Sequence, residues 1–109
     1  MLKAKLISQR RFSATAINGD RVSFYMDLYK LPEKAKGYPD GLKFSLIAFD
    51  ADRPNKRVLV DVHPPKGPHI HFDEDSQGVP FEWKGYAEAE RLFFQAAIKH
   101  FGLDPEDAP

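Results

Sequence analysis

The sequence predicts an α+β domain: an antiparallel β-meander of five or six strands with one C-terminal helix packed on one face. Two observations predict this class. Apolar and polar residues alternate with period two through much of residues 2–73, and apolar residues recur at helical spacing within residues 86–101. At 109 residues the chain is the size of one domain, so we expect residues 1–109 to form a single unit.

The first two strands are joined by Ile17-Asn18-Gly19-Asp20, a hairpin signal because Asn and Gly tolerate positive φ. A two-residue loop would set an apolar side chain against a polar one. A three-residue loop over residues 17–19 instead pairs Ala14 with Val22, and Phe12 with Phe24. This second register joins the apolar faces of the two strands, and we therefore expect it.

The later elements follow from similar patterns. Residues 42–49 (LKFSLIAF) are apolar on both faces, as expected of a central strand, and residues 57–63 and 69–73 form two more strands. Residues 86–101 contain neither Pro nor Gly and predict the helix, which Gly102 is placed to end in the left-handed conformation. We expect residues 103–109 to be a frayed tail.

Composition excludes several classes of function. Sixteen basic residues balance sixteen acidic ones, so bulk electrostatics does not favour nucleic-acid binding. The chain has no cysteine, which excludes disulfides, thiol nucleophiles and cysteine-ligated zinc. No signal peptide is evident, and no stretch approaches the ~18 apolar residues of a membrane span. We expect a cytoplasmic protein that does not enter a membrane.

The stretch DVHPPKGPHIHFD, residues 61–73, holds three of the four histidines. If two antiparallel strands are joined by a five-residue loop, His63 lies opposite His69. The same register places Asp61 opposite His71. Because side chains alternate between faces, the valines of the first strand turn toward the helix and the imidazoles lie on the other face. The ionisable residues predicted to share that face are Asp61, His63, His69, His71 and Asp73.

Acid–base catalysis without a cofactor is the first use we infer for this face. Imidazoles change charge near pH 6.5, so His63, His69 and His71 can donate and accept protons. Asp61 would fix the tautomer of a neighbouring ring. Such a site could cleave RNA through its 2′-hydroxyl, with Lys66 steadying the phosphate. Lys66 and Asp73 are the candidate binding residues.

Two other uses and a purely structural explanation remain open. His63, His69 and His71 form a three-ligand set for zinc or another divalent metal, with a position left for water. The face could also bind a partner without chemistry. Tyr25, Tyr29, Ile47 and Phe49 are expected on the same side and suggest a homodimer surface or the rim of a pocket. A hydrated sheet face with no function explains the same residues.

The last half of the chain resembles the TumE-type toxin components of bacterial toxin–antitoxin pairs. The matching residues are Pro68-His69-Ile70-His71, the preceding strand RVLVDVH and the helix YAEAERLFFQAAIKHF. The family has a denser histidine run, with an Asp/Asn turn where this chain has PPKG. The resemblance implies a small cytoplasmic toxin that acts on RNA or its translation and is neutralised by a DNA-binding antitoxin.

Overall fold

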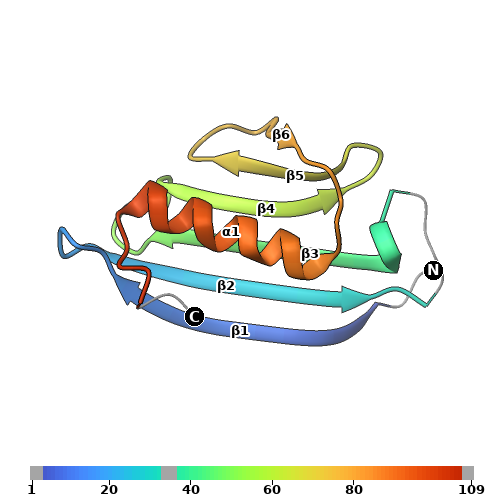
Figure 1. Ribbon diagram of the computed structural model, residues 1–109, viewed down its shortest axis with the longest axis horizontal. Coiled ribbons are helices and arrows are strands. Elements are labelled where there is room, and N and C mark those ends of the chain that lie inside the picture. The colour runs from blue at the N-terminus through green and yellow to red at the C-terminus, as the bar shows by residue number, and fades with distance from the viewer. Residues whose placement is uncertain (1–3, 33–36, 107–109) are drawn as a thin grey trace.

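The computed structural model describes residues 4–32 and 37–106, so the predicted start of the first strand at residue 2 and the last three tail residues lie outside it. Within these ranges the strands run antiparallel, each beside its neighbour in the chain (Figure 1). One helix follows them, which confirms the α+β class. The elements are β1 Lys5–Thr15, β2 Arg21–Lys30, η1 Pro39–Gly41, β3 Leu42–Asp50, β4 Arg57–His63, β5 Gly67–Phe72, β6 Val79–Pro80 and α1 Tyr86–Phe101.

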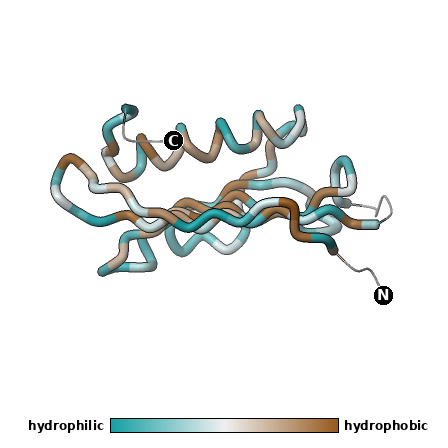
Figure 2. The backbone as a smooth tube through the Cα atoms, turned by 90° about the horizontal axis from the view of Figure 1, so that it is seen from below, coloured by the Kyte–Doolittle hydropathy of each residue, from teal (hydrophilic) through white to brown (hydrophobic). Residues whose placement is uncertain are grey.

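The helix α1 covers one face of the sheet and contacts β4 and β3 (Figure 2). Its buried Phe93 and Ala97 join the apolar side chains of the strands, among them Val58 and Val60, in one core. In β2 and β4 every second side chain is apolar and buried, and α1 covers the face on which these side chains lie. No helix in the described ranges is long and apolar enough to cross a membrane.

The first hairpin has the register that the sequence predicts. Phe12 lies opposite Phe24 and Ala14 opposite Val22, with the Phe12 and Phe24 rings stacked 4.7 Å apart. The three-residue loop closes through the Ala16 N–H, which donates to the Asp20 carbonyl at 2.7 Å. Matching apolar faces therefore selected the longer loop.

The helix has the predicted bounds, and Gly102 ends it with φ 68° in the left-handed conformation. The tail prediction is wrong at its first residue. Leu103 is buried and forms an antiparallel bridge with Ala16, and the Ile17 N–H donates to the Gly102 carbonyl at 2.9 Å. Leu103 follows the helix cap directly and packs against the first hairpin turn. Sequence periodicity describes local elements and does not reveal a contact between segments so far apart in the chain.

The second hairpin, β4–β5, differs in register from the prediction. Asp61 lies opposite His69 rather than His71, and His63 lies opposite Gly67. The loop is three residues long, Pro64 to Lys66, because β5 begins two residues earlier than expected. A shift of two residues keeps each paired strand residue on its predicted face, so His69 and His71 still point away from α1.

Candidate functional site

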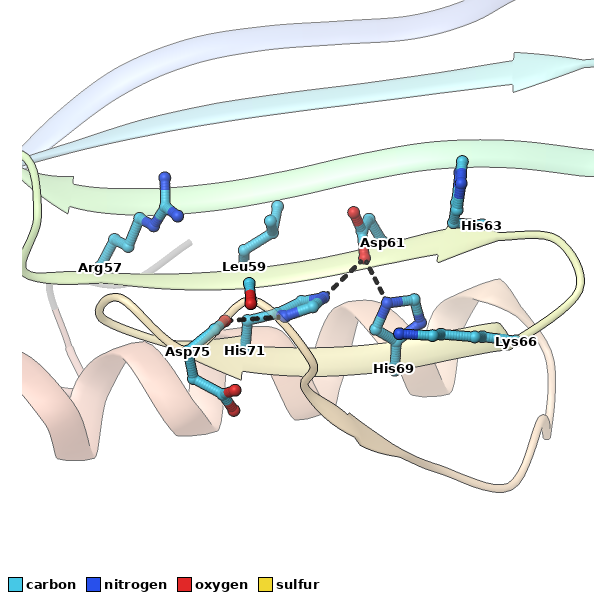
Figure 3. A pocket seen from close by; sticks show the side chains of 9 residues that line it. Arg57, Leu59, Asp61, His63, Lys66, His69, His71 and Asp75 are labelled. Atoms are coloured by element: carbon cyan, nitrogen blue, oxygen red, sulfur yellow. Dashed lines mark hydrogen bonds and ion pairs between the residues drawn. The ribbon is translucent and has the colours of Figure 1, made fainter.

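Three side chains converge on the face away from α1: Asp61 from β4, and His69 and His71 from β5 (Figure 3). Asp61 is the direct cross-strand partner of His69, and His71 follows two positions along the same strand. One Asp61 oxygen, Oδ1, lies 3.5 Å from Nε2 of His69 and 3.4 Å from Nε2 of His71. The strand pairing thus brings both imidazoles to one carboxylate oxygen.

Both imidazoles are buried, His69 with 5% and His71 with 6% of its surface exposed. The chain after β5 folds back over them, and Gly78 contacts both rings. A Cβ at position 78 would lie 2.8 Å from Cε1 of His71 and 2.9 Å from Cδ2 of His69. These two rings are therefore covered by protein, and a hydrated sheet face does not describe them.

One nitrogen of each ring is hydrogen-bonded to a backbone carbonyl. Nδ1 of His69 lies 2.7 Å from the Gly67 carbonyl oxygen, and Nδ1 of His71 lies 3.0 Å from the Asp75 carbonyl oxygen. A carbonyl can only accept, so each Nδ1 carries the proton that it donates. In a neutral imidazole the other nitrogen, Nε2, is then an acceptor. In that neutral form both Nε2 lone pairs face Asp61.

Asp61 Oδ1 is buried and has no hydrogen-bond partner. Its 3.4 and 3.5 Å separations from the two Nε2 atoms exceed the ~2.7–3.2 Å of an N–H···O hydrogen bond. Three acceptors therefore face one another without a donor between them. Such an arrangement is unfavourable for protein groups alone, because an unsatisfied buried acceptor loses its hydration and gains no replacement.

The three atoms have the spacing of metal ligands, since all lie within 4.8 Å of one another. Metal–ligand bonds of ~2.0–2.1 Å at the tetrahedral angle place neighbouring ligand atoms ~3.4 Å apart. The two Nε2–Oδ1 distances, 3.5 and 3.4 Å, match this value. The Nδ1–carbonyl bonds also fit, because histidine ligands characteristically donate their other nitrogen to such groups and are oriented by them.

A depression of about 310 Å³ opens beside these ligands. The Asp61 side chain is 27% exposed although its Oδ1 is buried, so the carboxylate lies at the border between protein and solvent. Besides the three converging residues, the walls are formed by Arg57, Leu59, His63, Lys66, Asp75 and Ser76. The charged residues of the walls have both signs, with Arg57 and Lys66 as the cations and Asp75 as an anion beside the acceptor cluster.

The other predicted site residues are divided between this depression and the opposite side of the sheet. His63 and Lys66 line the depression, but His63 is exposed and lies outside the converging group (Figure 3). The predicted pairing of His63 with His69 is wrong, because the shorter loop sets His63 against Gly67. His63 can contact a ligand in the depression.

Asp73 does not lie on the histidine face, and that predicted placement is wrong. Strand β5 ends at Phe72, and Asp73 has a left-handed φ of 54°. Its carboxylate accepts a 2.8 Å hydrogen bond from Nε2 of His100 on α1 and another from the Arg57 N–H. Burial raises the pKa of Asp73, but these hydrogen bonds outweigh it and hold the pKa below its ordinary value.

The backbone groups that support the site were not foreseen from the sequence. Gly67 and Asp75 contribute carbonyl oxygens. Gly78 leaves room for the two rings because it has no side chain. The only sequence signal is a glycine in the turn-rich run SQGVP, which by itself indicates a loop. These contacts depend on how the chain folds back after β5, which no local pattern records.

Comparisons with known proteins add no identification: no protein-family model, no curated protein and no solved structure matches this chain. The function therefore has to be inferred from the geometry of the site.

Proposed function

We propose that this protein binds a divalent metal ion through Asp61, His69 and His71. One observation carries the proposal: two Nε2 atoms, in rings whose Nδ1 atoms lie against backbone carbonyls, face a buried carboxylate oxygen that has no hydrogen-bond partner. A cation at their centre satisfies all three acceptors at once. This ligand set differs from the three histidines expected from the sequence, because Asp61 takes the place of His63.

A two-histidine, one-carboxylate set is typical of catalytic metal sites, which keep a position open for water or substrate. When bound, the metal would lower the pKa of such a water and so supply a nucleophile. Asp61 and the imidazoles would hold that position beside the depression, whose walls include Lys66 and Arg57. The reaction class that we infer is hydrolysis of an anionic substrate, with RNA as one candidate.

Zinc titration of protein purified without an affinity tag and stripped with a chelator tests the metal site. We expect one zinc ion per chain by calorimetry, and more than tenfold weaker binding in Asp61→Asn and His71→Gln. The matched controls are Asp73→Asn and His100→Gln, which alter the other Asp–His pair and should bind zinc like the wild type. Failure of the wild type to bind zinc, cobalt(II), manganese(II) or iron(II) rejects the proposal.

A second candidate is the metal-free acid–base site on RNA expected from the sequence. It is supported by the position of Asp61 Oδ1, which lies within 3.5 Å of both rings and would pair with either one protonated at Nε2. RNA cleavage that persists in chelator and is lost in His69→Ala and His71→Ala would favour it over the metal.

The same variants test the toxin role, which would imply a DNA-binding antitoxin as partner. Expression of the wild type should arrest growth, and the His69→Ala and His71→Ala variants should not. His100→Ala is the matched control and should remain toxic. If wild type and variants are equally harmless, the toxin role is rejected, whatever the metal measurements give.

A further inference from the structure

The sheet face that carries the site continues as a row of paired side chains across five strands, β5 to β1. The row begins at His71 on β5, and each member lies directly opposite the next: His71, Leu59, Ile47, Tyr25 and Arg11. At ~4.8 Å per strand the row extends about 19 Å from the site. The metal ligands and this surface are therefore one continuous face.

Aromatic rings stand in the middle of the row. Tyr25 is 45% exposed, and its ring meets the half-buried ring of Phe49 edge to face at 5.2 Å. The Arg11 guanidinium lies 4.5 Å from the centre of the Tyr25 ring. No helix covers this side of the sheet in the described ranges (Figure 2). A planar ligand can thus reach the exposed Tyr25 ring.

The charge of this face is positive, although the chain as a whole is neutral. Among the described strand residues from β1 to β5 that alternate onto it, the basic ones are Arg11, Arg21, Lys43 and Arg57. The acidic ones are Asp27 and Asp61. Asp27 is paired with Arg11 at 2.9 Å, and Asp61 belongs to the site. The face therefore attracts a polyanion through a local surplus that the overall composition conceals.

We propose that the open face of the sheet binds single-stranded nucleic acid, with bases against Tyr25 and Phe49 and phosphates near Lys43 and Arg57. Exposed rings beside basic side chains are the features that sequence-tolerant single-strand binding uses. A duplex keeps its bases stacked on each other and does not offer them to the rings. A second copy of the chain would set like charges against each other across the same face.

The row also gives the bound strand a direction toward the depression. The row begins at His71, which also lines the depression, and its next member Leu59 lines the same walls. Arg57, two residues before Leu59 on β4, lines them too. A strand along the row would bring a phosphodiester to the proposed metal. This last step rests on the proposed function, whereas binding to the face does not.

Fluorescence anisotropy with labelled single-stranded RNA and DNA of about ten nucleotides tests the binding in chelator. We expect Tyr25→Ala to weaken it at least about fivefold, and Tyr25→Phe to retain it, because the ring performs the stacking. Lys43→Gln should reduce the salt dependence by about 0.7 in the log–log slope. Separate RNA and DNA arms identify which strand is preferred.

Matched controls lie on the side of α1. Phe72 is also an exposed aromatic residue and Lys99 an exposed lysine, so Phe72→Ala and Lys99→Gln should bind like the wild type. Equal weakening in Phe72→Ala and Tyr25→Ala overturns the inference, as does no binding or tighter binding of a duplex. A wild-type dimer that Tyr25→Arg dissociates, measured by light scattering, assigns the face to a second copy instead.

The two proposals can fail separately. Asp61→Asn removes a metal ligand and a negative charge, so it should bind the oligonucleotide at least as tightly as the wild type while losing zinc. If the wild type binds the oligonucleotide but does not bind zinc, the metal site is rejected and the nucleic-acid face is kept. The reverse result rejects the nucleic-acid face alone. Circular dichroism and thermal unfolding of each variant check that it is folded.

Discussion

Two Asp–His groups lie on opposite sides of the sheet, and they differ in whether the carboxylate oxygen has a hydrogen-bond donor. Nε2 of His100 donates to Asp73 at 2.8 Å, and the same carboxylate oxygen accepts the Arg57 N–H. In the other group, Asp61 Oδ1 has no donor, although two Nε2 atoms lie 3.4 and 3.5 Å away. The first group is a completed set of hydrogen bonds, whereas in the second the carboxylate oxygen has no partner.

The position of the ring proton accounts for this difference. His69 and His71 each donate Nδ1–H to a backbone carbonyl, which leaves Nε2 as the acceptor toward Asp61. His100 instead turns Nε2 toward its carboxylate. The same residue types therefore stabilise the fold in one place and form the proposed cation site in the other, and the difference arises from their backbone hydrogen bonds.

The largest expected effect is a difference between Asp61→Asn and Asp73→Asn in how much zinc stabilises each variant against thermal unfolding. At 100 times its dissociation constant, zinc should stabilise the wild type and Asp73→Asn by about 2.7 kcal/mol. It should leave Asp61→Asn unchanged. In chelator, Asp61→Asn should be more stable than the wild type by about 1 kcal/mol, because its amide donates to an Nε2 acceptor. Equal stabilisation of both variants by zinc would place the metal elsewhere.

A smaller effect should separate two glycines of similar backbone conformation. Gly78 has φ 72° and Gly102 has φ 68°, so alanine at either position costs about 1–2 kcal/mol of backbone strain. Only at position 78 would the new Cβ meet the two imidazoles, whereas nothing lies within 4 Å at position 102. We expect Gly78→Ala to be less stable than Gly102→Ala by about 2 kcal/mol in urea unfolding.

Zinc affinity provides the second measurement on this pair. Gly78→Ala should weaken zinc binding about tenfold, because displaced rings no longer direct both Nε2 atoms to one point. Gly102→Ala should leave it unchanged. If the two variants are alike in stability and in zinc affinity, the cover over the imidazoles does not position them.

The smallest expected effect is the acid dependence of the completed pair. The pKa of Asp73 is held below its ordinary value, so its stabilising contribution is complete above that ordinary value, near pH 4. It is lost as the pH falls through the lowered pKa. Asp73→Asn should therefore show a shallower loss of unfolding free energy than the wild type between about pH 5 and pH 2. Parallel curves from urea unfolding at each pH would contradict this.

The two hairpins indicate how much of this structure the sequence predicts. In β1–β2 the alternative loop would have set apolar Val22 against a polar residue, so apolar matching fixed the register. In β4–β5 the predicted and observed registers differ by two residues, and both keep Val60 and Val62 toward α1. Hydrophobic alternation determines the face of each residue but cannot distinguish registers two residues apart.

The candidate site shows the same division. The alternation of β5 predicted that His69 and His71 would lie on the face away from α1. Their burial, their tautomers and the exclusion of His63 depend instead on loop length and on the return of the chain over β5. Local patterns therefore predicted which residues lie on this face. Which of them come together, and which atoms they turn toward one another, could be seen only in the tertiary structure.

The bridge between Ala16 and Leu103 joins a turn near the beginning of the chain to the residue that follows the helix cap. Contacts between segments so far apart raise the contact order and slow folding, since the intervening chain must be ordered first. During synthesis the apolar face of the sheet would remain uncovered until α1 has left the ribosome. The nascent sheet is therefore a candidate for chaperone binding until its last element is made.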